Sequence, residues 1–138
     1  MDEFSTPSSE YLLEIRIEEL HKESKVWVSR INLWKRELDF FQKLLDKYSI
    51  KFDTSDLKKQ EDHFQNLIIY YNGELLESFK QSVRRQEKNL GSLLQATEYV
   101  DEAAFRIQHI ELKEKIDSFD TEFRKPKHEF FELIEKVM

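Results

Sequence analysis

Apolar residues recur along the first third of the chain at alternating intervals of four and three residues. This spacing places them on one stripe of an α-helix and, when it is sustained, defines a heptad repeat. The members of this stripe are Leu13, Ile17, Leu20, Ser24, Trp27, Ile31, Trp34, Leu38, Phe41, Leu45, Tyr48 and Phe52. Because only Ser24 is polar, the pattern predicts one long amphipathic helix over about residues 7–50 with a packed core along its seam.

The same rhythm returns over about residues 54–90, with one shift in its phase. The apolar seam runs regularly from Leu57 to Leu75 and then drifts in the way that defines a stutter. Gly73 lies at this point, where a glycine costs roughly 1 kcal/mol relative to alanine in a helix. The sequence therefore predicts a second helix that is locally unwound near Gly73, with a bend or a close approach of two backbones there.

A third heptad pattern occupies about residues 96–137. It passes through Phe105, His109, Leu112, Ile116, Phe119, Phe123, Pro126, Phe130, Leu133 and Val137. The turn before it has two candidate positions, since Gly91-Ser92 offers a helix cap and Thr97-Glu98 offers a second start. We expect the turn between residues 91 and 97, and a kink at Pro126, which cannot donate a backbone hydrogen bond.

Composition agrees with a fold made of a few long helices. Two Gly and two Pro among 138 residues leave little material for the tight turns of a sheet protein. Short connections between long helices make neighbouring helices antiparallel. The sequence therefore predicts an all-α protein, an elongated up-down-up antiparallel three-helix bundle with coiled-coil-like heptad packing, as a single domain over residues 1–138.

The charge pattern argues against several classes of partner. The formal net charge is −6, and acidic and basic residues alternate along the chain, so no basic surface for nucleic acid is predicted. The N-terminus has no basic and apolar leader, and no stretch is apolar enough to cross a membrane. The chain has no cysteine, which excludes disulfides and thiolate metal sites. We expect a cytoplasmic protein that binds neither nucleic acid nor membranes.

His109 is the one histidine that the heptad pattern directs inward. If the second turn lies near residue 96, antiparallel counting places His109 near Ser24 on the first helix and near Ser82 or Gln86 on the second, whereas a turn at Gly91 would bring no such layer together. Buried polar groups need partners, so a polar layer of Ser24, Ser82 and His109 would penalise slipped helix alignments. The alternative interpretation is that His109 belongs to a buried ligand or proton site.

Other candidates for chemistry do not form a catalytic or metal-binding arrangement. Glu18 and His21 have the Glu-x-x-His spacing of di-iron helical bundles, but they lie beside the seam and no second such motif accompanies them. His128 and Glu132 share a helix face that is predicted to be solvated. No nucleophile elbow or glycine-rich phosphate loop is present. We therefore expect neither enzymatic activity, nor a metal site, nor a cofactor.

Surplus apolar positions provide the main functional clue. Four residues of the first helix recur in steps of seven or fourteen away from the main seam, namely Leu12, Val26, Leu33 and Phe40. A second extra stripe on the third helix contains Val100, Ala103, Ile107 and Ile110. Either the packed faces broaden to include these residues, or the stripes bind another chain.

The sequence thus favours a non-enzymatic protein–protein interaction or scaffold module, with self-association as a homodimer through Leu12, Val26, Leu33 and Phe40. The alternative is a helical-bundle protein that binds a metal or a small ligand, for which His109, His21 and Glu18 are the candidate residues.

Overall fold

The computed structural model describes the backbone of residues 7–95 and 101–138, and the side chains of residues 17–95 and 101–138. It consists of three helical rods, and no strand occurs in these ranges. The first rod is α1 (Pro7–Lys47), which is followed by the short 3-10 turn η2 (Ser49–Lys51). The second joins α2 (Ser55–Ile68), the π-helix η3 (Ile69–Leu75) and α3 (Leu76–Gln95), and the third is α4 (Glu102–Val137). The prediction of an all-α bundle is confirmed.

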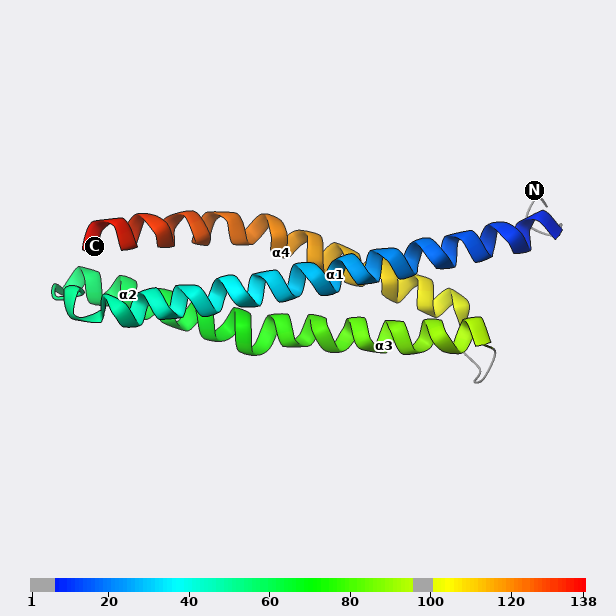
Figure 1. The fold of residues 1–138 in the computed structure, drawn as a ribbon, viewed down its shortest axis with the longest axis horizontal. Helices are drawn as coiled ribbons and strands as arrows, with labels where there is room; N and C mark the ends of the chain where they lie inside the picture. Colours follow the sequence, from blue (N-terminus) through cyan, green and yellow to red (C-terminus); the bar gives the residue numbers. More distant parts are fainter. Residues whose placement is uncertain (1–6, 96–100) are drawn as a thin grey trace.

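The three rods lie side by side in an elongated bundle (Figure 1). Helix α1 runs along the whole assembly and its N-terminal end extends beyond the ends of α3 and α4. The C-terminal end of α4 lies next to the turn that joins α1 to α2. The bundle is therefore most complete in the half that contains this turn.

Side-chain contacts fix the direction of each rod. Gln42 of α1 exchanges two hydrogen bonds with Gln65, whereas Lys35 forms an ion pair with Glu77. Residue numbers on the second rod thus increase along the bundle as those on α1 decrease, which makes the two rods antiparallel. Residue numbers on α1 and α4 increase in the same direction, so these two rods are parallel: Glu23 lies near Lys113, Arg30 near Asp117, and Glu37 near Lys127. The topology is up-down-up, as predicted.

The heptad positions form the core. Along α1 and the turn that follows it, the described heptad positions from Ile17 to Phe52 are buried, except that Leu20 and Tyr48 are half-buried. Phe119 of α4 lies where all three rods meet, with its ring centroid 4.8 Å from that of Trp34 and 5.0 Å from that of Tyr71. Edge-to-face aromatic pairs at such distances add to the stability that burial provides. An aromatic core therefore joins the rods near their middle.

The phase shift in the second rod appears as the π-helix η3. A π-helix closes its hydrogen bonds over five residues, so its wider turn takes up an additional residue and the helix continues. Tyr71 and Leu76 remain in the core on either side of this shift. The predicted close backbone approach at Gly73 is wrong, since Gly73 is exposed and a Cβ atom there would meet nothing within 4 Å.

The element boundaries differ from those predicted near residues 50 and 91. Helix α1 ends at Lys47 rather than near residue 50. The second rod continues through Gly91 to Gln95, so of the two candidate turn positions Gly91-Ser92 is helical, and the expected interval 91–97 is helical up to Gln95. Burial of Leu90 and Ser92 holds this stretch against the bundle and outweighs the low helix propensity of glycine. The other candidate start, Thr97-Glu98, lies outside the described residues.

The third rod begins later than the expected residue 96. Its N-cap is Asp101, whose side chain accepts a hydrogen bond from the backbone N–H of Ala104 at 3.2 Å. Helix α4 then continues through Pro126 as one element.

Candidate interaction site

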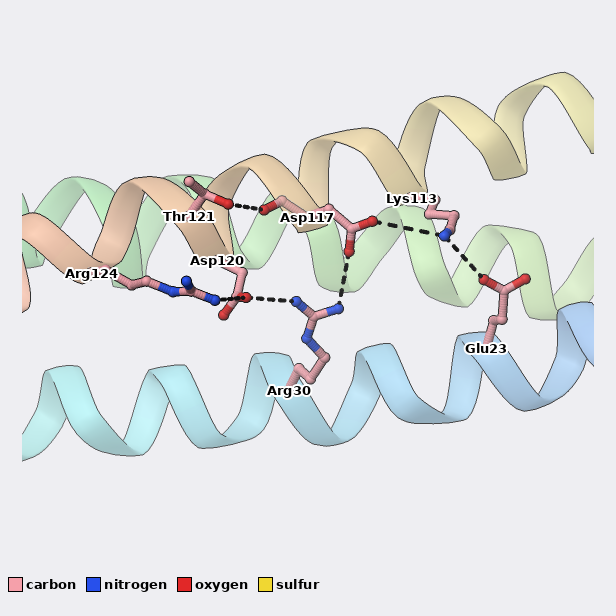
Figure 2. Close-up of polar contacts among 7 residues, drawn as sticks. All are labelled: Glu23, Arg30, Lys113, Asp117, Asp120, Thr121 and Arg124. Carbon is pink, nitrogen blue, oxygen red and sulfur yellow. Dashed lines mark hydrogen bonds and ion pairs between the residues drawn. The ribbon is translucent and has the colours of Figure 1, made fainter.

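An ion-pair network holds α1 against α4 (Figure 2). Arg30 lies at its centre, with its guanidinium nitrogens 3.2 Å from Asp117 Oδ1 and 3.5 Å from Asp120 Oδ2. Lys113 extends the network, since its Nζ lies 3.8 Å from Asp117 and 3.9 Å from Glu23. These groups are half-exposed or exposed, and such pairs contribute only about 0–1 kcal/mol each. The network positions two rods and offers no enclosed site for chemistry.

The predicted polar layer lies at one end of this network. Ser24 and His109 are each 2% exposed. On the second rod the polar residue buried at this level is Gln86, whose Nε2 donates to the carbonyl oxygen of Phe105 at 3.1 Å, whereas Ser82 is half-buried. Ser82 precedes the core residue Val83, so it lies at the edge of the interface and lines a small groove beside Gln86.

His109 has unusual surroundings for a buried imidazole. Its ring centroid lies 4.5 Å from that of Trp27, and its Nε2 lies 3.5 Å from Glu23 Oε1 without the geometry of a hydrogen bond. Nδ1 has no hydrogen-bond partner. Burial lowers the pKa of His109 below its usual value, and the negative charge of Glu23 opposes this shift. The imidazole is therefore held as a neutral side chain in an apolar setting.

The candidate metal ligands are not gathered into one site. His21 pairs across the interface with Glu87, its Nδ1 lying 2.9 Å from Glu87 Oε2, while Glu18 is exposed to solvent. His128 and Glu132 form an exposed pair within α4. Among the side chains that the structure describes, no group of three or more His, Asp or Glu residues is arranged to hold a metal ion.

The extra apolar residues of α1 lie outside the bundle. Val26, Leu33 and Phe40 are 55%, 58% and 53% exposed, and we refer to these three residues as the α1 stripe. The packed faces have therefore not broadened to include them. The side chain of Leu12, the fourth predicted member, lies outside the described residues.

The corresponding residues of α4 are uncovered as well. Ala103, Ile107 and Ile110 are exposed, and Val100 lies outside the described residues.

A groove between the second rod and α4 was not predicted from the sequence. It has a volume of about 740 Å³ and is lined on one side by residues from Leu67 to Phe79, including η3, and on the other by residues from Glu111 to Glu122. Buried aromatic side chains form its floor, and burial followed by the charge of Glu122 raises the pKa of Tyr71 there. The stutter was the available signal, because π-helices often occur at functional sites.

Comparisons with known proteins add no assignment. No protein family matches the chain, and neither curated proteins nor solved structures give a match. Among the helices that the structure describes, none is both long enough and apolar enough to cross a membrane. The candidate sites therefore rest on the geometry alone, and they are the α1 stripe and the groove beside η3.

Proposed function

We propose that this protein is a non-enzymatic helical interaction module that associates with a second copy of itself through the α1 stripe. The observation that carries the proposal is the exposure of three large apolar side chains at one heptad position of a long helix. Val26, Leu33 and Phe40 each leave more than half of their surface in contact with water. Heptad spacing brings such residues onto one line, the pattern through which helices pair.

Burial of the α1 stripe against a second copy would lower the free energy of the complex. Removing apolar surface from water contributes roughly 25 cal/mol per Å², and exposed apolar lines on helical proteins commonly mark interfaces. The stripe extends over about 21 Å, at 1.5 Å per residue between Val26 and Phe40. An interface centred on so short a line falls at the small end of the range for protein complexes. We therefore expect reversible association that depends on protein concentration.

The distribution of perturbed groups supports the non-enzymatic part of the proposal. Active sites gather several groups with shifted pKa values in one cleft. Within the described residues, Tyr71 lies in the groove, His109 lies in the polar layer, and Glu77 has its pKa lowered by a hydrogen bond from Lys35 on another face. The three groups lie in different places: burial is the main cause of the shift for Tyr71 and for His109, and the hydrogen bond from Lys35 is the main cause for Glu77.

Native mass spectrometry over a range of protein concentrations tests the proposal. The wild-type chain should give a dimer whose share rises with concentration, and Leu33→Glu combined with Phe40→Lys should reduce that share at least tenfold. The matched control is Ile50→Glu, because Ile50 is 90% exposed and lies outside the stripe in η2. A wild-type monomer at all concentrations, or equal effects of the stripe and control variants, would contradict the proposal.

A further inference from the structure

The groove beside η3 leaves apolar side chains of the second rod accessible to solvent. Tyr70 is 47% exposed, and Leu67 and Leu75 are half-buried. Beneath them the buried rings of Tyr71, Phe79 and Phe119 form the floor, and Phe119 lies 5.0 Å from Tyr71 and 6.1 Å from Phe79 between ring centroids. Because η3 widens the second rod here, its side chains are spread more broadly than those of a regular α-helix.

The rim of the groove carries an excess of negative charge. On the α4 side it contains the carboxylates of Glu111, Glu114 and Glu122, with the ammonium group of Lys115 as the only opposing charge among the lining residues described. All four are exposed to solvent. The second rod contributes neutral side chains to the rim, among them Tyr70 and Ser78.

The charge changes along the length of the groove. Towards the end of α3 the groove adjoins a smaller one of about 200 Å³, where Arg85 joins Lys115 and Glu111. Glu114 and Glu122 line the main groove alone, whereas Glu111 and Lys115 line both grooves.

From this arrangement we propose that the groove binds an amphipathic α-helix of a partner protein, with its apolar stripe against Leu67, Tyr70 and Leu75 and with Lys or Arg residues facing Glu114 and Glu122. A helix laid between two rods would complete a four-helix bundle, in which each helix packs against two neighbours. Helix-in-groove recognition uses apolar anchors at intervals of three and four residues, which an elongated floor accommodates. The acidic rim selects basic flanks and repels acidic ones.

This inference is independent of self-association through the α1 stripe. None of the residues that line the groove belongs to α1. A Leu33→Glu variant should therefore still bind an amphipathic helix in the groove, and the two proposals can fail separately.

Fluorescence anisotropy with two labelled designed peptides tests the inference. Both are helices of about 21 residues, three heptads with Leu at the inward positions. One carries Lys on both flanks and the other carries Glu. The full chain should bind the Lys peptide saturably and at least tenfold more tightly than the Glu peptide.

Two double variants of equal charge locate the binding site. Glu114→Lys with Glu122→Lys reverses the rim, whereas Glu132→Lys with Glu135→Lys makes the same change on exposed α4 residues outside the groove. The rim variant should weaken binding of the Lys peptide at least tenfold, and the control less than threefold. Absence of saturable binding, equal binding of both peptides, or equal loss in both variants would overturn the proposal.

Discussion

His109 combines nearly complete burial with an incomplete set of polar partners. Its ring packs against Trp27, and the nearest carboxylate is that of Glu23. A neutral imidazole tolerates this setting, whereas an imidazolium would lose hydration without gaining a good hydrogen bond. The side chain therefore links the stability of the bundle to pH.

The pKa of His109 is lower in the folded chain than in the unfolded chain, so the unfolded state takes up a proton first as the pH falls. The free energy of unfolding should decrease below the usual pKa of histidine, about 6.5, by at most about 1.4 kcal/mol per pH unit for one proton. Urea unfolding of wild type and His109→Leu between pH 7.5 and pH 5 measures this contribution.

The difference between the two proteins isolates His109 from the other histidines. The difference in the free energy of unfolding should be constant above about pH 7.5. On acidification the wild type should lose more stability than His109→Leu. Because the charge of Glu23 raises the pKa of His109, Glu23→Gln should steepen the loss at low pH. A difference that is independent of pH would contradict the assigned protonation state.

At the scale of elements, Gly91 lies within α3 although glycine disfavours helices. Its neighbours Leu90 and Ser92 are buried, and a Cβ atom at Gly91 would meet nothing within 4 Å. Packing of the neighbouring side chains therefore keeps this segment helical. The same reasoning identifies a position where the natural residue is not the most stabilising one.

Gly91→Ala should raise the free energy of unfolding by about 1 kcal/mol, because alanine loses less backbone entropy in a helix and fills open space. Urea denaturation measures this change. The same exchange at Gly73, also open to a Cβ atom, gives the comparison in the π-helix. Destabilisation by Gly91→Ala would show that this residue needs the backbone freedom of glycine.

Comparing the predicted helices with the observed ones shows how much of the structure the heptad spacing determines. Heptad spacing predicted the seams of all three rods, because burial of apolar side chains is what that spacing records. It predicted the phase shift near Gly73 but not its realisation as η3. It could not decide between Gly91-Ser92 and Thr97-Glu98 as the turn, because local propensity does not include tertiary packing.

Prediction of the candidate sites was partial. The exposure of Val26, Leu33 and Phe40 follows from their place outside the seam. The groove does not follow from any one helix, since it depends on how η3 and α4 are spaced, and that spacing is set by the whole core.

At the scale of the whole molecule, aromatic packing around Phe119 connects the three rods. Its ring contacts Trp34 of α1, Tyr71 of η3 and Phe123 of α4, with centroid distances from 4.8 to 5.1 Å. The floor of the groove shares Tyr71 and Phe119 with this core, so the packing that joins the rods also supports the binding surface proposed above.

Phe119→Ala should therefore destabilise the entire chain rather than one helix. Removing a fully buried phenylalanine costs about 3–5 kcal/mol, which is a large share of the roughly 5–15 kcal/mol that stabilises a typical domain.

The matched control is Phe131→Ala, since Phe131 is 42% exposed and packs on Phe41 at the surface of the bundle. Its loss should cost about 1 kcal/mol. Urea unfolding followed by circular dichroism and by tryptophan fluorescence should give one coincident, shifted transition for Phe119→Ala, because Trp27 and Trp34 report the core and the helical signal reports all three rods. Separate transitions from the two probes would mean that the rods unfold independently and that the aromatic core does not connect them.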